Sequence, residues 1–172
     1  MPAPIATSLI DRVDDTDQPV GVVARRDAIR QRAGFRVVHI FVFDSVGNLL
    51  LQQLGHERER SPLLLGSSVA GYLFAGESYA EAATRRLREE LLIETPLRKL
   101  GATSMDDEGA RKFIELYETI SDDASIGEEG HIENLIYLGI PEIEELLTMH
   151  PERFTETFPH VLRLYQAVSP PT

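Results

Sequence analysis

Residues 35–43, FRVVHIFVF, are the feature that most constrains the fold. Apart from Arg36 and His39, every side chain in this stretch is apolar, so both faces of an extended segment would be apolar. A strand of this kind belongs in the middle of a sheet that is covered on both sides, whereas a strand with one wet face alternates apolar and polar residues. The stretch therefore predicts a layered domain built on a central sheet.

The segments that flank this strand predict further strands and helices. The other strands are expected at 48–54, 67–71, 97–105, 112–120 and 131–140, and residues 8–24 are expected to form a separate N-terminal hairpin. Helices are expected at 25–34 with Gly34 closing the end, at 78–91, at 141–150, and at about 152–168 with a kink at Pro159. A chain of 172 residues in this order predicts one domain, 1–172, with an α/β sandwich around a mixed β-sheet.

The charge balance limits the partners of the chain. There are 17 Lys and Arg residues against 28 Asp and Glu residues, which gives a net charge of −11. Such a charge repels polyanions and anionic membrane surfaces, so neither a nucleic acid nor a membrane is the expected partner. An anionic substrate such as a diphosphate would need a divalent cation to neutralise the site. Whether the partner is a small-molecule diphosphate is open at this point, and a homodimer is an open option as well.

The chain contains no cysteine. This excludes disulfides, thiolate nucleophiles, zinc–thiolate sites and iron–sulfur clusters. The first residues, MPAPIATSLIDRV, lack the basic and apolar regions of a secretory signal, and no run of about 18 apolar residues occurs anywhere. We therefore expect a cytoplasmic protein.

The stretch GESYAEAATRRLREELLIE, residues 76–94, combines an apolar stripe with paired charges. The stripe of the expected helix is formed by Ala80, Ala83, Leu87 and Leu91. Two arginines each precede a glutamate by four residues, and the simplest interpretation is two salt bridges on a solvated face, each worth about 0.3–0.5 kcal/mol. The alternative is that the carboxylates are aimed at a metal ion.

The glycine and glutamate upstream of the helix favour the metal interpretation. The spacing of residues 71–93 resembles the Nudix box, G-x5-E-x7-R-E-U-x-E-E-x-G-U, in which U is aliphatic. The matching residues are Gly71, Glu77, Arg85, Leu87, Glu89, Glu90 and Ile93. Two positions depart from the pattern, since Arg86 replaces a glutamate and Leu92 replaces a glycine.

The resemblance implies a Nudix-type α/β/α sandwich and a pyrophosphohydrolase. Nudix enzymes generally cleave a diphosphate linkage in a nucleotide derivative or small organic diphosphate, by attack of water assisted by Mg²⁺ or Mn²⁺. Carried over by position, Glu89 and Glu90 are catalytic metal ligands, together with the backbone carbonyl of Gly71. By the same resemblance, Glu77 pairs with Arg85 to lock the loop against the helix.

Arg86 leaves the activity open, because its guanidinium competes with a cation for the neighbouring carboxylates. Three alternatives follow: weaker or altered metal binding, contact with a substrate phosphate, or an outward-facing side chain without a role. Arg86 and Tyr72 are the expected substrate contacts. If the metal is lost altogether, the chain would be a Nudix-fold binding protein without catalysis.

The order of elements around the box resembles the branch that contains isopentenyl diphosphate isomerases. That enzyme uses a cysteine just before the box glycine, and histidines that bind a metal. In this chain the corresponding residues are Ala70, Tyr72 and Phe35. Isomerase activity is therefore not expected.

Two further expectations concern the segments around the helix. A general base is often supplied in this family by a glutamate in a later loop, where Glu128, Glu129 and Glu133 are candidates, and Glu129 is the predicted one. Because Leu92 replaces the glycine that would end the helix, the helix is expected to continue and to stop before Thr95 and Pro96.

Overall fold

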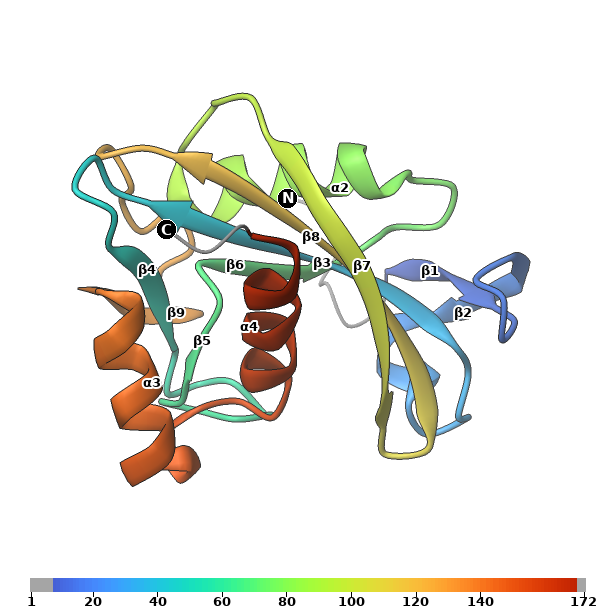
Figure 1. The fold of residues 1–172 in the computed structure, drawn as a ribbon. Helices are drawn as coiled ribbons and strands as arrows, with labels where there is room; N and C mark the ends of the chain where they lie inside the picture. The colour runs from blue at the N-terminus through green and yellow to red at the C-terminus, as the bar shows by residue number, and fades with distance from the viewer. Residues whose placement is uncertain (1–7, 170–172) are drawn as a thin grey trace.

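A computed structural model describes residues 8–169 of the chain. Its centre is a mixed sheet of seven strands (Figure 1). The strands of this sheet are β3 (Phe35–Phe43), β4 (Leu49–Leu54), β5 (Leu65–Gly66), β6 (Val69–Tyr72), β7 (Arg98–Asp107), β8 (Ala110–Ile120) and β9 (Ile132–Leu138). The order is β5-β4-β3-β8-β7, with β6 also paired to β3 and β9 to β4. The β3–β8 pair is parallel and the other pairs are antiparallel, which confirms the predicted mixed sheet.

Helices cover both faces of this sheet, so the α/β/α sandwich is confirmed (Figure 1). Helix α2 (Tyr79–Leu91) packs on one face, and helices α3 (Ile140–Met149) and α4 (Thr157–Val168) pack on the other. Strand β3 lies between the two cores, and seven of its nine residues are buried. The strand is apolar on both faces because both faces are buried, as the sequence predicted.

The N-terminal hairpin forms a two-stranded sheet of its own, β1 (Leu9–Val13) and β2 (Pro19–Ala24). Helix α1 (Arg25–Ala28) is shorter than expected, and Gly34 does not close it. A Cβ at Gly34 would lie 2.5 Å from the carbonyl oxygen of Val13, so glycine is needed there for the close approach of two backbones. The first seven residues, on which the absence of a secretory signal was argued, lie outside the described part.

The end of α2 differs from the expectation. The helix ends at Leu91, and Leu92 itself adopts the left-handed conformation, with φ 58° and ψ 34°. The reason lies in the loop after β8: the backbone N–H groups of Ser125 and Gly127 donate to the carbonyls of Leu91 and Glu90, at 3.0 and 2.8 Å. These carbonyls are satisfied by the loop only if the helix stops here.

The C-terminal helix is also divided differently. A short 3-10 turn, η2 (Pro151–Arg153), precedes α4, which starts at Thr157. Pro159 therefore lies in the first turn of a new helix, where no N–H is required, and the expected kink is wrong.

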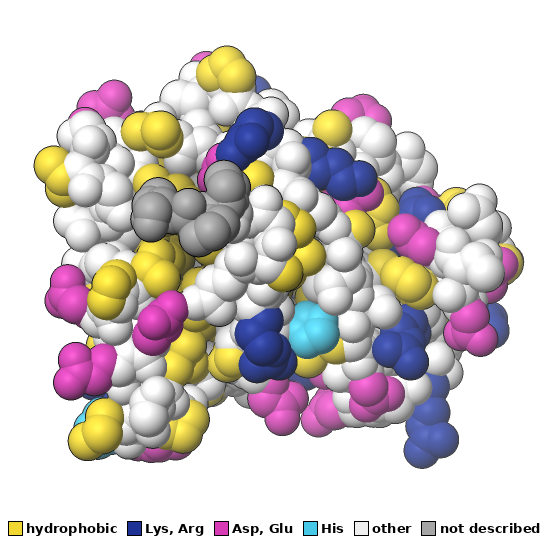
Figure 2. Space-filling model, viewed as in Figure 1, with side chains coloured by type: hydrophobic (Ala, Val, Ile, Leu, Met, Phe, Trp, Pro, Cys, Tyr) yellow, Lys and Arg dark blue, Asp and Glu magenta, His cyan; other side chains and the backbone are white. Residues whose placement is uncertain are grey.

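The surface mixes charges of both signs. On the face that carries α4, Lys and Arg side chains alternate with Asp and Glu side chains and form no single basic patch (Figure 2). Among residues 8–169, no helix is long and apolar enough to cross a membrane.

Candidate active site

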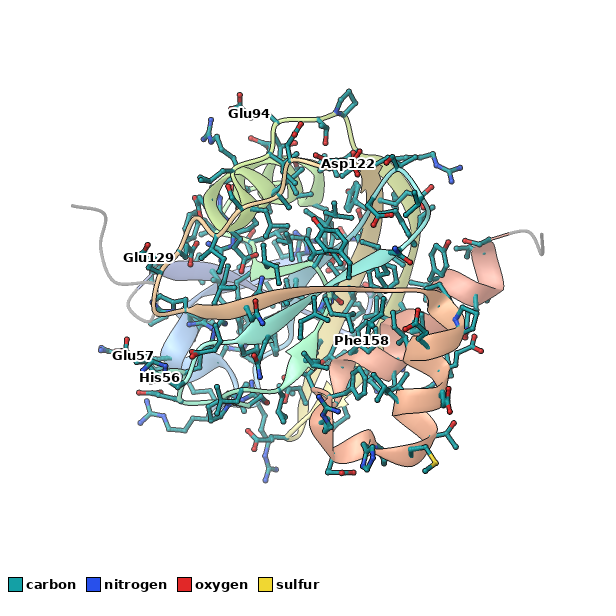
Figure 3. All side chains as sticks on the ribbon, turned by 90° about the vertical axis from the view of Figure 1, so that its left-hand side faces the viewer. His56, Glu57, Glu94, Asp122, Glu129 and Phe158 are labelled. Carbon is teal, nitrogen blue, oxygen red and sulfur yellow. The ribbon has the colours of Figure 1, made fainter. Side chains whose placement is uncertain are left out.

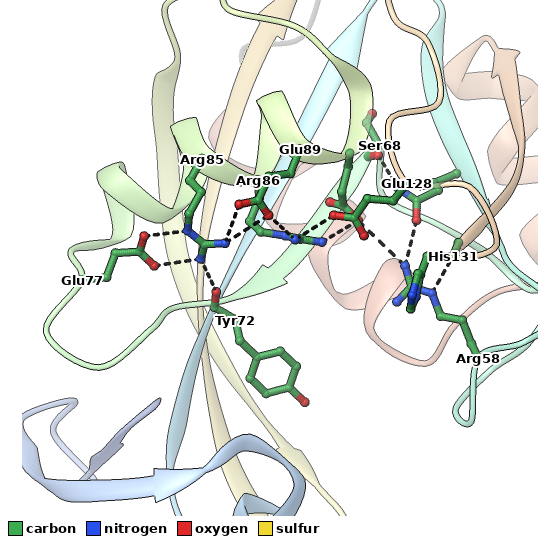
Figure 4. A network of polar contacts seen from close by, with 11 residues as sticks. Arg58, Ser68, Tyr72, Glu77, Arg85, Arg86, Glu89, Glu128 and His131 are labelled. Atoms are coloured by element: carbon green, nitrogen blue, oxygen red, sulfur yellow. Dashed lines mark hydrogen bonds and ion pairs between the residues drawn. The ribbon is translucent and has the colours of Figure 1, made fainter. Parts of the chain in front are cut away.

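Glu77 and Arg85 fasten the loop before α2 to the helix. Nε and Nη2 of Arg85 donate to the two carboxylate oxygens of Glu77 at 2.7 and 2.9 Å, and Nη2 also donates to the carbonyl of Tyr72 at 3.1 Å (Figure 4). Burial raises the pKa of Glu77, but Arg85 and the N–H of Phe74 outweigh it, so the pKa lies below its usual value. The arrangement is that of a structural lock.

Arg86 is buried and touches three carboxylates. Its side chain is only 8% exposed. Nη1 donates to Glu89 at 2.6 Å and to Glu128 at 3.0 Å, and Nη2 lies 3.2 Å from Glu90 in an ion pair (Figure 4). Burial lowers the pKa of Arg86, but the three carboxylates together raise it above the usual value, so the side chain is charged. This excludes the outward-facing alternative.

Gly71 on β6 lies directly against the stem of Arg86. A Cβ built on Gly71 would be 2.6 Å from Nε, 2.8 Å from Cγ and 2.9 Å from Cδ of the arginine. The box glycine is therefore required here because an arginine side chain passes over its backbone.

Glu90 is the least solvated carboxylate of the cluster. It is fully buried, and neither of its oxygens has a hydrogen-bond partner among the described residues. Its nearest positive groups are Arg86, at 3.2 Å, and Nη2 of Arg58, at 3.9 Å. Burial raises its pKa, and the two arginines oppose this only in part. A cation must lie beside Glu90 for it to remain ionised.

The loop after β8 brings Glu128 to the cluster and leaves the other candidates outside. Glu128 contacts Arg86, whereas Glu133 accepts from the ring of His56 at 2.9 Å. Glu129 is exposed at the outer edge of the loop, and its side chain makes no hydrogen bond or ion pair within residues 8–169 (Figure 3). The structure thus brings Glu128, and not the predicted Glu129, to the helix. Only the fold of the loop distinguishes these two neighbours.

Two more arginines approach the same region. Nε of Arg58 donates to the carbonyl of His131 at 2.9 Å, and the guanidinium carbon of Arg25 lies 4.2 Å from the ring centroid of Tyr72. Burial lowers the pKa of Arg58, and the negative charge of Glu90 opposes this only in part. Sequence reasoning missed Arg25, because only the fold brings its guanidinium over the ring of Tyr72.

The expected metal does not fit the site while Arg86 lies as it does. Two of its predicted ligands, Glu89 and Glu90, are paired with Arg86, and the stem of the arginine passes over Gly71. In the part of the chain that the structure describes, no group of three or more His, Cys, Asp or Glu side chains is arranged to hold a metal ion. The guanidinium contacts both glutamates that the resemblance assigns to the cation.

Comparison with known proteins gives the class of this chain. The model of the NUDIX domain family matches residues 34–160. Together with the box and the sandwich fold, this match shows that the chain belongs to the Nudix hydrolase superfamily.

The individual relatives carry two kinds of name. An isopentenyl-diphosphate Delta-isomerase of Pectobacterium atrosepticum is 30% identical over 151 residues, covering 85% of this chain and 84% of the relative. A Nudix hydrolase of Deinococcus radiodurans is 31% identical over 121 residues, covering 69% and 71%. A solved crystal structure of a Deinococcus radiodurans protein is similar with a TM-score of 0.80 and 27% identity, covering 94% of this chain and 99% of that one.

Proposed function

We propose that the protein is a pyrophosphohydrolase that cleaves a diphosphate linkage in a nucleotide derivative or a small organic diphosphate, with Mg²⁺ or Mn²⁺ as the accompanying cation. The observation that carries this proposal is the meeting of guanidinium and carboxylate groups on the box helix. Arg86 contacts Glu89 and Glu128 at hydrogen-bond distance, and Arg58 lies nearby. In a chain of net charge −11, Arg86 and Arg58 are the positive groups of this region that a phosphate would contact.

The arginines and the carboxylates of the cluster each supply one requirement of the reaction. The oxygen of a water molecule forms a bond to one phosphorus, the bond from that phosphorus to the bridging oxygen breaks, and the proton of the water passes to a carboxylate. Arginine holds phosphate oxygens through its planar fork. Glu128, which is 19% exposed, and Glu89, which is 37% exposed, are the carboxylates that water reaches.

The roles of the predicted residues follow from their exposure. Glu89 stays a candidate catalytic group, and Glu128 takes the role of base that the sequence assigned to Glu129. Glu90 is fully buried, so we place it as a positioning residue that holds Arg86. Because Arg86 fills the place of a resident metal, we propose that the divalent cation enters bound to the diphosphate, as part of the substrate.

Isomerase chemistry does not fit the residues of this chain, despite the names of some relatives. The chain has no cysteine, and Ala70 stands before the box glycine. Where the resemblance expects two histidines, Tyr72 and Phe35 stack on each other with ring centroids 5.2 Å apart. Neither ring carries the nitrogen that a histidine would offer to a metal ion.

A second candidate is a binding protein that has kept the scaffold and lost catalysis. The observation that favours it is that Arg86 already contacts three carboxylates, so that neither the arginine nor the glutamates are free for a reaction. In this case a diphosphate would bind without being hydrolysed.

A turnover panel separates the two candidates. Release of phosphate or pyrophosphate would be measured with nucleotide and isoprenoid diphosphates, each with Mg²⁺ or Mn²⁺. The hydrolase account expects turnover of at least one compound and a loss of about 10²–10⁴-fold in Glu128→Gln, the usual contribution of a general base. The matched variant Glu129→Gln tests the sequence assignment, because a loss there instead would move the base to Glu129. Binding of a diphosphate without any turnover would support the binding protein.

A further inference from the structure

The carboxylate cluster of α2 contains more negative than positive charge, and one arginine stands at its centre. Glu89, Glu90 and Glu128 all contact Arg86, and Glu90 has only Arg58, at 3.9 Å, as a second cation. Arg85 is mainly engaged by Glu77, at 2.7 Å. Without Arg86, three carboxylates would share a largely desolvated site, which proteins avoid.

We propose that the guanidinium of Arg86 is the resident cation of this cluster, and that the free protein therefore binds no divalent metal ion between Gly71, Glu89 and Glu90. The inference concerns the site of the proposed function, but it rests on the contacts alone. It goes beyond the family resemblance, which places a metal there, and it assigns to the chain itself the charge that the metal would supply.

The contacts of Arg86 show how its guanidinium stands in for a cation. One nitrogen, Nη1, reaches Glu89 and Glu128, and the other, Nη2, faces Glu90. The stem fills the space over Gly71, where even a methyl group would lie under 3 Å from it. A Mg²⁺ ion needs several oxygen ligands at about 2.0–2.1 Å around it. A guanidinium in contact with the same oxygens occupies the space where the ion would have to lie, and its charge repels a second cation.

The inference also explains the state of Glu90. A buried carboxylate needs a cation close to it, and the guanidinium groups of Arg86 and Arg58 lie 3.2 and 3.9 Å from Glu90. In this chain that cation is a side chain of the protein itself, so the carboxylates have a positive partner as soon as the chain folds. The stability of the protein is then independent of divalent metal.

The test is a titration with Mn²⁺ alone, without substrate, followed by electron paramagnetic resonance of the free ion. The variant Arg86→Glu removes the guanidinium and restores the box residue. Arg88→Glu is the matched control, because it makes the same change of charge on the same helix at a side chain that is 62% exposed. We expect no saturable binding to the native protein or to Arg88→Glu, and binding at least about 10-fold tighter in Arg86→Glu.

Two results would overturn the inference. One is saturable Mn²⁺ binding to the native protein that is lost in Glu89→Gln, a comparison that does not depend on whether Arg86→Glu folds. The other is a folded Arg86→Glu that binds Mn²⁺ no better than Arg88→Glu.

A second readout uses Arg86→Gln, which leaves the carboxylates without their cation. We expect its melting temperature to rise on addition of Mg²⁺, while that of the native protein stays constant. A native melting temperature that rises with Mg²⁺ as much as that of Arg86→Gln would contradict the inference. Turnover of a diphosphate, or its absence, changes none of these results, so failure of the proposed function is distinguishable from failure of this inference.

Discussion

Arg85 and Arg86 are adjacent in the chain, and each is followed by a glutamate four residues later, yet their surroundings differ. Arg85 is 16% exposed and holds Glu77 in a two-point ion pair, whereas Arg86 is 8% exposed and contacts three carboxylates. Glu89 is 37% exposed, and Glu90 is fully buried. One residue along a helix is a rotation of about 100°, which here separates the rim of the site from its interior. The same spacing therefore gives a loop lock in one case and a buried cluster of an arginine with three carboxylates in the other.

The largest expected effect is the difference in stability between removing the two arginines. Arg86→Met leaves Glu90 buried without its close partner and should lower the free energy of unfolding by about 3–5 kcal/mol. Arg85→Met leaves Glu77 partly exposed and able to gain water, so about 1–3 kcal/mol is expected. Denaturant unfolding of both variants measures this difference. Equal losses would mean that the two arginines do not differ as described.

The next effect concerns the loop that carries Glu128. A Cβ at Gly127 would lie 2.3 Å from the carbonyl oxygen of Glu89, so Gly127→Ala should push the loop away from α2. We expect a loss of about 1–3 kcal/mol of stability and, if the protein turns over a diphosphate, a lower kcat. Gly21→Ala is the control, since nothing lies within 4 Å of its added Cβ. A neutral Gly127→Ala would show that the loop does not press on the helix.

The two glutamates should respond to pH in opposite directions. The pKa of Glu90 is raised, so the folded state holds its proton more tightly and the stability that Glu90 contributes falls as pH rises from about 4.5 toward the folded pKa. The pKa of Glu77 is lowered, so its contribution is present above about 4.5 and is lost as pH falls through the folded pKa. Unfolding of Glu90→Gln and Glu77→Gln across this pH range, each compared with the native protein, shows the two slopes. Slopes of the same sign would contradict the account.

The smallest effect is at the end of α2. Leu92 has a positive φ, which disfavours any residue with a side chain by about 1–2 kcal/mol relative to glycine. Part of the gain from Leu92→Gly is offset by the greater freedom of glycine in the unfolded chain, so we expect up to about 1 kcal/mol of stabilisation. Leu92→Ala keeps the strain and should show no gain. A thermal melt of both variants checks this, and a destabilised Leu92→Gly would mean that the side chain of Leu92 matters more than its backbone.

Much of the fold could be predicted because its elements are local patterns. The two apolar faces of residues 35–43, the N-terminal hairpin and the pairing of 97–105 with 112–120 follow from the alternation of side chains and from turn residues. The end of α2 was predicted wrongly, since the stop comes from the N–H groups of a loop more than thirty residues later in the chain. Local sequence carries no signal for such a contact.

The sequence predicted the Nudix box, but it did not predict which charged side chains of the box are buried. The stripe assigned to α2 included Ala80, which is exposed, and it left out Arg86 and Glu90, which are buried. Charged residues are assigned to the solvated face by default, because their burial needs partners that only the fold supplies. Here the partners are Gly71, whose missing side chain admits the arginine, and Glu128 from the later loop.

The central claim, that Arg86 replaces a metal ion, is tested most directly by diffraction from crystals soaked in Mn²⁺ without substrate. The account predicts no anomalous peak between Gly71, Glu89 and Glu90, and electron density for the Arg86 guanidinium in contact with Glu89 and Glu128. An anomalous peak within ligand distance of Glu89 and Glu90, with the arginine turned away, would contradict it.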